Sequence, residues 1–121
     1  MGKNAENKDM KTLAKIHEIL KFYDDSMDAD DIDFSMLSAK KLKISENRFV
    51  RIMTMLSDAG YIDGIGAREN NDGTVDLLFE DSAITLAGLK YYAENSLFLK
   101  AAGFLPGFIT AGVSTVATAV L

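Results

Sequence analysis

Basic and amide side chains concentrate in one stretch of this sequence, between residues 40 and 54. Arginine and asparagine are the side chains that read guanine and adenine edges in the major groove, and lysine ammonium groups bind phosphates. On a helix that begins at Ser45, the outward side would carry Asn47, Arg51, Thr54 and Asp58, with Arg48 and Val50 beside them. We therefore predict a contact with double-stranded DNA, made by Lys40, Lys41, Lys43, Asn47, Arg48, Arg51, Thr54 and Arg68.

The charge of the chain supports this prediction only locally. The net charge is −5, which does not favour attraction of the whole molecule to nucleic acid. Residues 40–51 nevertheless hold five basic side chains against Glu46 alone. Asp58, Glu69 and Asp72 weigh against a DNA contact. The alternative interpretation is a domain used for protein contacts, with its lysines merely solvated.

Six aspartates between residues 24 and 33 raise the question of a calcium loop. Counted from Asp24, oxygen-bearing side chains do fall at loop positions 1, 3, 5 and 7 of an EF-hand. However, position 6 is Ala29 where the motif needs glycine, and position 12 is Ser35 where it needs a bidentate glutamate. We expect a solvated acidic loop and no metal site.

The chain has few residues that are suited to catalysis. It has one histidine, His17, and no cysteine, and it carries no phosphate-binding loop or dinucleotide fingerprint. We expect neither an enzyme nor a cofactor. The absence of cysteine and of an apolar leader favours a cytoplasmic protein in its host cell.

Hydrophobic periodicity predicts the elements that would position the basic residues. We expect helices over residues 8–23, 34–42, 45–59 and 85–100, and a β-hairpin over residues 61–80 with its turn at Asn71, Asp72 and Gly73. This order predicts an α+β winged helix-turn-helix: three helices, a hairpin wing and a C-terminal helix, within a domain of residues 1–100.

The same periodicity predicts which side of each helix is buried. In the first helix the apolar face is Met10, Leu13, Ile16, His17, Leu20 and Tyr23, with Phe22 opposite and in need of a cover from downstream. In the third it is Phe49, Ile52, Met53, Leu56 and Ala59. In the last it is Leu86, Leu89, Ala93 and Leu97, and Gly88 suggests a closely packed neighbour. We expect His17 to pack and not to transfer protons.

The C-terminal segment, residues 101–121, carries no charge in 21 residues. Its length meets the criterion for a membrane span of about 20 residues, and Gly103 and Gly107 have a small-xxx-small spacing. Small residues and Pro106 interrupt it, however. Two interpretations remain: a helix within 104–121 that packs in the fold or in an oligomer, and a membrane contact.

Two longer motifs resemble the YjcQ family of small bacterial and prophage-encoded proteins. They are KISENRFVRIMTMLSDAGYIDGI and ITLAGLKYYAENS. The matching residues are Ile44-Ser45, Gly60-Tyr61-Ile62, Ile84-Thr85-Leu86, Gly88-Leu89, Tyr91 and Glu94-Asn95-Ser96. The resemblance covers roughly residues 8–100 and implies a winged-helix fold and a phage or mobile-element origin. It implies no activity and no catalytic residues, and the uncharged tail departs from the family pattern.

These observations predict a small phage-related DNA-binding protein or transcriptional regulator that acts without a cofactor. The alternative is a protein–protein adaptor that forms a homo-oligomer, or contacts a membrane, through residues 101–121.

Overall fold

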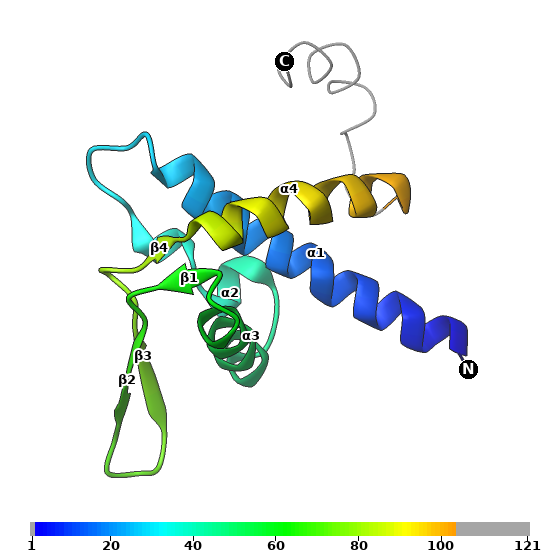
Figure 1. The fold of residues 1–121 in the computed structure, drawn as a ribbon. Helices are drawn as coiled ribbons and strands as arrows, with labels where there is room; N and C mark the ends of the chain where they lie inside the picture. The colour runs from blue at the N-terminus through cyan, green and yellow to red at the C-terminus, as the bar shows by residue number, and fades with distance from the viewer. Residues whose placement is uncertain (1, 104–121) are drawn as a thin grey trace.

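The computed structural model describes residues 2–103, with side chains described from residue 10 onward. The fold is α+β, as the sequence predicts. Its elements are α1 (Gly2–Ser26), the 3-10 helix η1 (Phe34–Met36), α2 (Ala39–Leu42), α3 (Glu46–Asp58), β1 (Ile62–Asp63), β2 (Gly66–Glu69), β3 (Val75–Leu78), β4 (Ala83–Ile84) and α4 (Leu86–Ala101) (Figure 1). The helix predicted within residues 104–121 lies outside the described residues.

The core forms where α1, α2 and α3 meet the two short strand pairs, while α4 packs along α1. Apolar side chains recur at helical spacing along α1 and α3, so each helix buries one face. The buried apolar residues are Ile16, Ile19, Leu20, Tyr23, Leu37, Ala39, Leu42, Phe49, Ile52, Met53, Leu56, Ile62 and Leu99.

Helix α1 is longer than predicted and is buried along a slightly different face. It starts at Gly2 and ends at Ser26, whereas the prediction was 8–23. The prediction omitted Ile19, which is fully buried, and centred the face on His17, which is only half-buried. The predicted cover for Phe22 is present, because the ring of Phe34 lies 5.8 Å from it.

The helix predicted over residues 34–42 is wrong as a single element. Two caps divide it: Asp33 accepts a hydrogen bond from the Ser35 amide, and Ser38 accepts one from the Lys41 amide. Each cap starts a separate helix because its side chain satisfies an otherwise unpaired amide. Leu37 lies between them in an extended conformation.

The predicted hairpin is correct at its tip and wrong at its base. Strands β2 and β3 pair antiparallel, with Gly66 opposite Leu78 and Glu69 opposite Val75. Residues Ile62–Asp63 instead pair with Ala83–Ile84 as a second ladder, β1–β4. Gly64 permits the close approach of the two segments between the ladders: its φ is +85°, and a Cβ there would lie 2.5 Å from the Asp81 carbonyl oxygen.

The face of α4 that packs is not the predicted leucine face. Gly88, Asn95 and Leu99 are buried, whereas Leu86 is 70% exposed and Leu97 is 66% exposed. The reason lies at Gly88, where a Cβ would come within 2.1 Å of the Tyr61 carbonyl oxygen. The absence of a side chain lets α4 approach β1 closely, so the side of the helix that carries Gly88 turns inward. This agrees with the closely packed neighbour expected at Gly88.

We predict that Gly88→Ala destabilises the fold although alanine favours helices. The gain in helix propensity is about 1 kcal/mol. A methyl group pressed against the Tyr61 backbone costs about 1–3 kcal/mol or more, since backbone cannot move aside as a side chain can. Urea unfolding measures the difference. Gly66→Ala is the matched control, because its Cβ would meet Leu78 at an ordinary 3.7 Å. Equal stability of the two variants would show that the Tyr61 backbone does not exclude a side chain at residue 88.

Candidate nucleic-acid interface

Helix α3 presents a polar face because its opposite face is held in the core. Ser45 caps the helix by accepting a hydrogen bond from the Arg48 amide at 3.0 Å. Phe49, Ile52, Met53 and Leu56 are buried. The predicted outward positions Asn47, Arg51, Thr54 and Asp58 are exposed, and so is Ala59, which the prediction had placed on the buried face.

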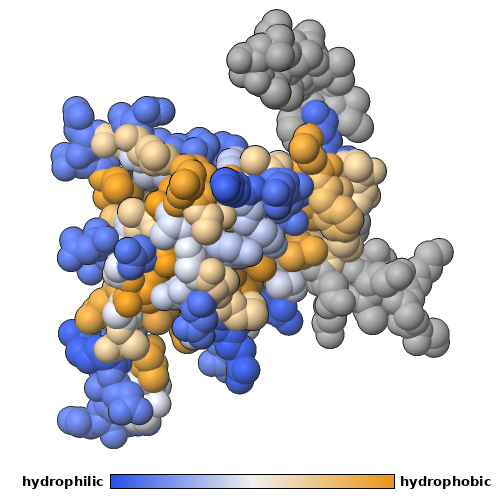
Figure 2. All heavy atoms as spheres, in the orientation of Figure 1, coloured by the Kyte–Doolittle hydropathy of each residue, from blue (hydrophilic) through white to orange (hydrophobic). Residues whose placement is uncertain are grey.

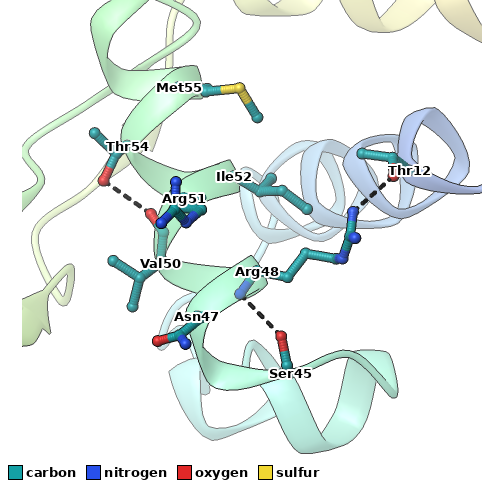
Figure 3. Close-up of a pocket in the computed structure, with 9 residues that line it drawn as sticks. All are labelled: Thr12, Ser45, Asn47, Arg48, Val50, Arg51, Ile52, Thr54 and Met55. Atoms are coloured by element: carbon teal, nitrogen blue, oxygen red, sulfur yellow. Dashed lines mark hydrogen bonds between the residues drawn. The ribbon is translucent and has the colours of Figure 1, made fainter. Parts of the chain in front are cut away.

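A shallow hollow of about 580 Å³ runs along this exposed face. Figure 3 shows Asn47, Arg51 and Thr54 along one side of α3, and Arg48 extended from α3 toward α1. The Nη1 atom of Arg48 donates a hydrogen bond to Thr12 Oγ1 at 3.0 Å, so α1 holds this guanidinium. The hollow is lined by Thr12, Ser45, Asn47, Arg48, Val50, Arg51, Ile52, Thr54 and Met55.

Four cationic side chains line a smaller neighbouring hollow of about 230 Å³. They come from three parts of the chain: Lys11 and Lys15 from α1, Lys43 from the end of α2, and Arg48 from α3. Lys15 also forms an ion pair with Glu18 at 3.1 Å. Closely placed positive charges attract a phosphate more strongly than one cation does. The arrangement is therefore suited to a polyanion.

Lys11 and Lys15 were missing from the sequence-based prediction. Their spacing of four residues on a helix indicates that they share a face. Only the packing of α1 against α3 shows that this face lies beside Arg48.

The three predicted lysines of the α2 region do not act together. Lys43 ends α2 in a left-handed conformation (φ 62°) and lies in the cationic hollow. Lys40 is exposed but lines neither hollow. Lys41 lies toward the acidic loop. There, hydrogen bonds from Ser35 hold the pKa of Asp33 below its ordinary value, and the charge of Lys41 adds a smaller contribution.

Arg68 is already paired. It lies opposite Asp76 on the neighbouring strand, and its Nη2 is 3.0 Å from Asp76 Oδ2. This hydrogen bond lowers the pKa of Asp76. The groove between β3 and the start of α3 also contains Glu46 and Glu80, so this groove carries three carboxylates against one arginine. It is electrostatically unfavourable for a phosphate.

His17 packs within the fold, as predicted, and its partner is an aromatic ring. Its imidazole lies 5.0 Å from the Tyr92 ring, measured between centroids. Partial burial, with a further contribution from the charge of Lys21, lowers the His17 pKa; Glu18 opposes the shift. The residue is therefore neutral at pH 7. Within residues 10–103, no cluster of three His, Cys, Asp or Glu side chains is arranged to hold a metal ion.

Comparison with known proteins identifies one family. The family model for YjcQ protein matches residues 17–105. Neither a curated protein nor a solved structure matches the chain. Among the helices of residues 2–103, none has the length and apolar character needed to span a bilayer.

The lowered His17 pKa predicts a pH dependence of stability. Because the unfolded chain binds the extra proton first, the contribution of His17 is fully present above the unfolded pKa. It is lost as the pH falls from about 6.5 toward the folded pKa. Urea unfolding at pH 7.5 and 5.5 should show a larger loss in the native protein than in His17→Phe, which keeps a ring against Tyr92. An equal loss in both proteins would exclude His17 as the cause.

Proposed function

The chain belongs to the YjcQ family, and we propose that this member is a winged-helix protein that binds double-stranded DNA through the exposed face of α3. One observation carries the proposal: the polar row of α3 continues into a cluster of four cations supplied by α1, α2 and α3. Side chains of the kinds that read base edges would thus lie beside side chains of the kinds that bind phosphates.

The order and spacing of the elements support a winged helix. Only residues 43–45 separate α2 from α3, as in a helix-turn-helix, which would make α3 the recognition helix. The β2–β3 hairpin follows and would be the wing (Figure 1). A winged-helix protein of phage or mobile-element origin, as the family resemblance implies, would act as a transcriptional regulator. The proposal assigns it no catalytic step.

The distribution of charge favours a DNA footprint over α1 and the start of α3, and not over the β2–β3 hairpin. Phosphates would lie over Lys11, Lys15, Lys43 and Arg48, at the N-terminal half of α3. Asn47 and Arg51 would then face base edges. The hairpin contributes less, because Arg68 would have to give up or share its ion pair with Asp76. The net charge of −5 is compatible with this footprint, since six of the twelve aspartates of the chain lie elsewhere, in residues 24–33.

Fluorescence anisotropy with labelled duplex DNA across a salt series tests the proposal. If all four cations release phosphate counterions, the logarithm of the binding constant should fall with the logarithm of salt concentration at a slope of about −3 to −4. No binding at low salt would refute DNA recognition.

Two substitutions should have different effects on DNA binding. Lys43→Ala removes a phosphate contact, so affinity should fall similarly for all sequences and the salt slope should shrink by about 1. Arg51→Ala removes a base contact and should cost about 1–3 kcal/mol on the preferred sequence, with less effect on other sequences. Both residues are exposed, so the fold should persist. Lys21→Ala is the matched control and should bind normally, because Lys21 is exposed, pairs with Asp25 and lines neither hollow; an equal loss in all three variants would contradict the footprint.

A further inference from the structure

Helix α4 leaves an unusually apolar face on the surface. Its outward residues are Leu86, Ala87, Lys90, Ala93, Glu94, Leu97, Phe98 and Ala101. Phe98 is 52% exposed, and Leu86 and Leu97 are more exposed still. Figure 2 shows apolar side chains on the surface over the C-terminal half of α4. The face carries only two charges, one of each sign.

The spacing on this face is that of a helix-pairing seam. Leu86, Lys90, Ala93 and Leu97 follow one another at intervals of four, three and four residues. This alternation is the spacing of the a and d positions of a coiled coil, which face a partner helix. Glu94 lies directly beside the seam, at an e position if Ala93 is taken as d.

Two copies of this seam are complementary when they run antiparallel. In an antiparallel pair centred between Lys90 and Ala93, Leu86 faces Leu97 of the second copy. The long stem of Lys90 then packs over the small Ala93, and its ammonium group reaches Glu94 of the second copy. Because of the two-fold symmetry, each of these contacts occurs twice. A parallel pair would instead place Lys90 against Lys90, which is repulsive.

We propose that α4 is a homodimer interface, in which this face pairs antiparallel with α4 of a second copy of the chain. The charges favour a second copy of the chain, and not a lipid surface, as the partner of this α4 face. A helix that lies on a membrane gathers cations on its polar face and keeps its apolar face uncharged. Here an acidic residue, Glu94, borders the leucines. Among the side chains described, those of residues 10–103, neither Lys90 nor Glu94 forms an ion pair, so both are available to a second copy.

The dimer would leave the proposed DNA-binding face free. Figure 1 shows α4 along one side of the molecule and α3 with the β2–β3 hairpin on the other. Two copies joined through α4 would present two α3 helices, so a DNA site would consist of two related half-sites. The interface itself does not depend on DNA binding, and its test contains no DNA.

Analytical ultracentrifugation of the full chain over a range of concentrations tests the interface. The native protein should dimerise. Lys90→Glu and Glu94→Lys should each weaken the dimer roughly tenfold or more, because each creates two like-charge contacts. The double variant Lys90→Glu/Glu94→Lys should restore the dimer, and an equimolar mixture of the two single variants should form heterodimers. Circular dichroism verifies that each variant is folded, as expected for exposed positions.

Three results would overturn the proposal. The first is a native protein that stays monomeric at all concentrations. The second is a dimer that both charge reversals leave unchanged, which would place the interface elsewhere. The third is a monomer that co-sediments with phosphatidylcholine–phosphatidylserine vesicles, which would assign the leucine face to a lipid surface.

Discussion

The close approach of α4 to β1 at Gly88 determines which surfaces of this protein are buried and which are free. The backbone at Tyr61 occupies the space that a side chain at residue 88 would need. Around this point Thr85 donates through its amide to the Tyr61 carbonyl and through its hydroxyl to the Gly60 carbonyl, and Tyr91 stacks on Tyr61 at 4.6 Å. Once the Gly88 side is buried, the leucines on the opposite side of α4 must face outward.

Helix α1 contacts both the strand pair beneath α4 and the basic residues beside α3. Its buried row ends at Tyr23, whose hydroxyl lies 2.7 Å from Ser82 Oγ beside β4. Because the Ser82 hydroxyl donates to the Phe79 carbonyl, Tyr23 is the donor in this pair. Burial raises the pKa of Tyr23, which keeps the phenol protonated and able to donate. The other half of the same helix brings Lys11 and Lys15 beside Arg48. One helix thus fixes both the strand pair under α4 and the cationic hollow beside α3.

Local sequence patterns predicted α3 well and other parts less well. The bounds of α3 are correct to within one residue, because Ser45 is a strong cap and its buried face has clear helical periodicity. The division of residues 34–42 was missed because two short-range caps outweighed a continuous helical pattern. The orientation of α4 was missed because hydrophobicity favours Leu86 and Leu97, whereas tertiary packing favoured the glycine side. The convergence of Lys11 and Lys15 with Arg48 is likewise a property of packing, which periodicity within one helix cannot show.

We propose that DNA lies over the N-terminal half of α3 and the adjacent part of α1. Mapping of backbone amide chemical shifts during titration with a DNA duplex tests this footprint. If DNA binds there, the largest changes will fall on residues 43–54 and on Lys11 to Lys15, and the α4 amides will keep their chemical shifts. Changes confined to α4 or to the β2–β3 hairpin, or no changes at all, would contradict it.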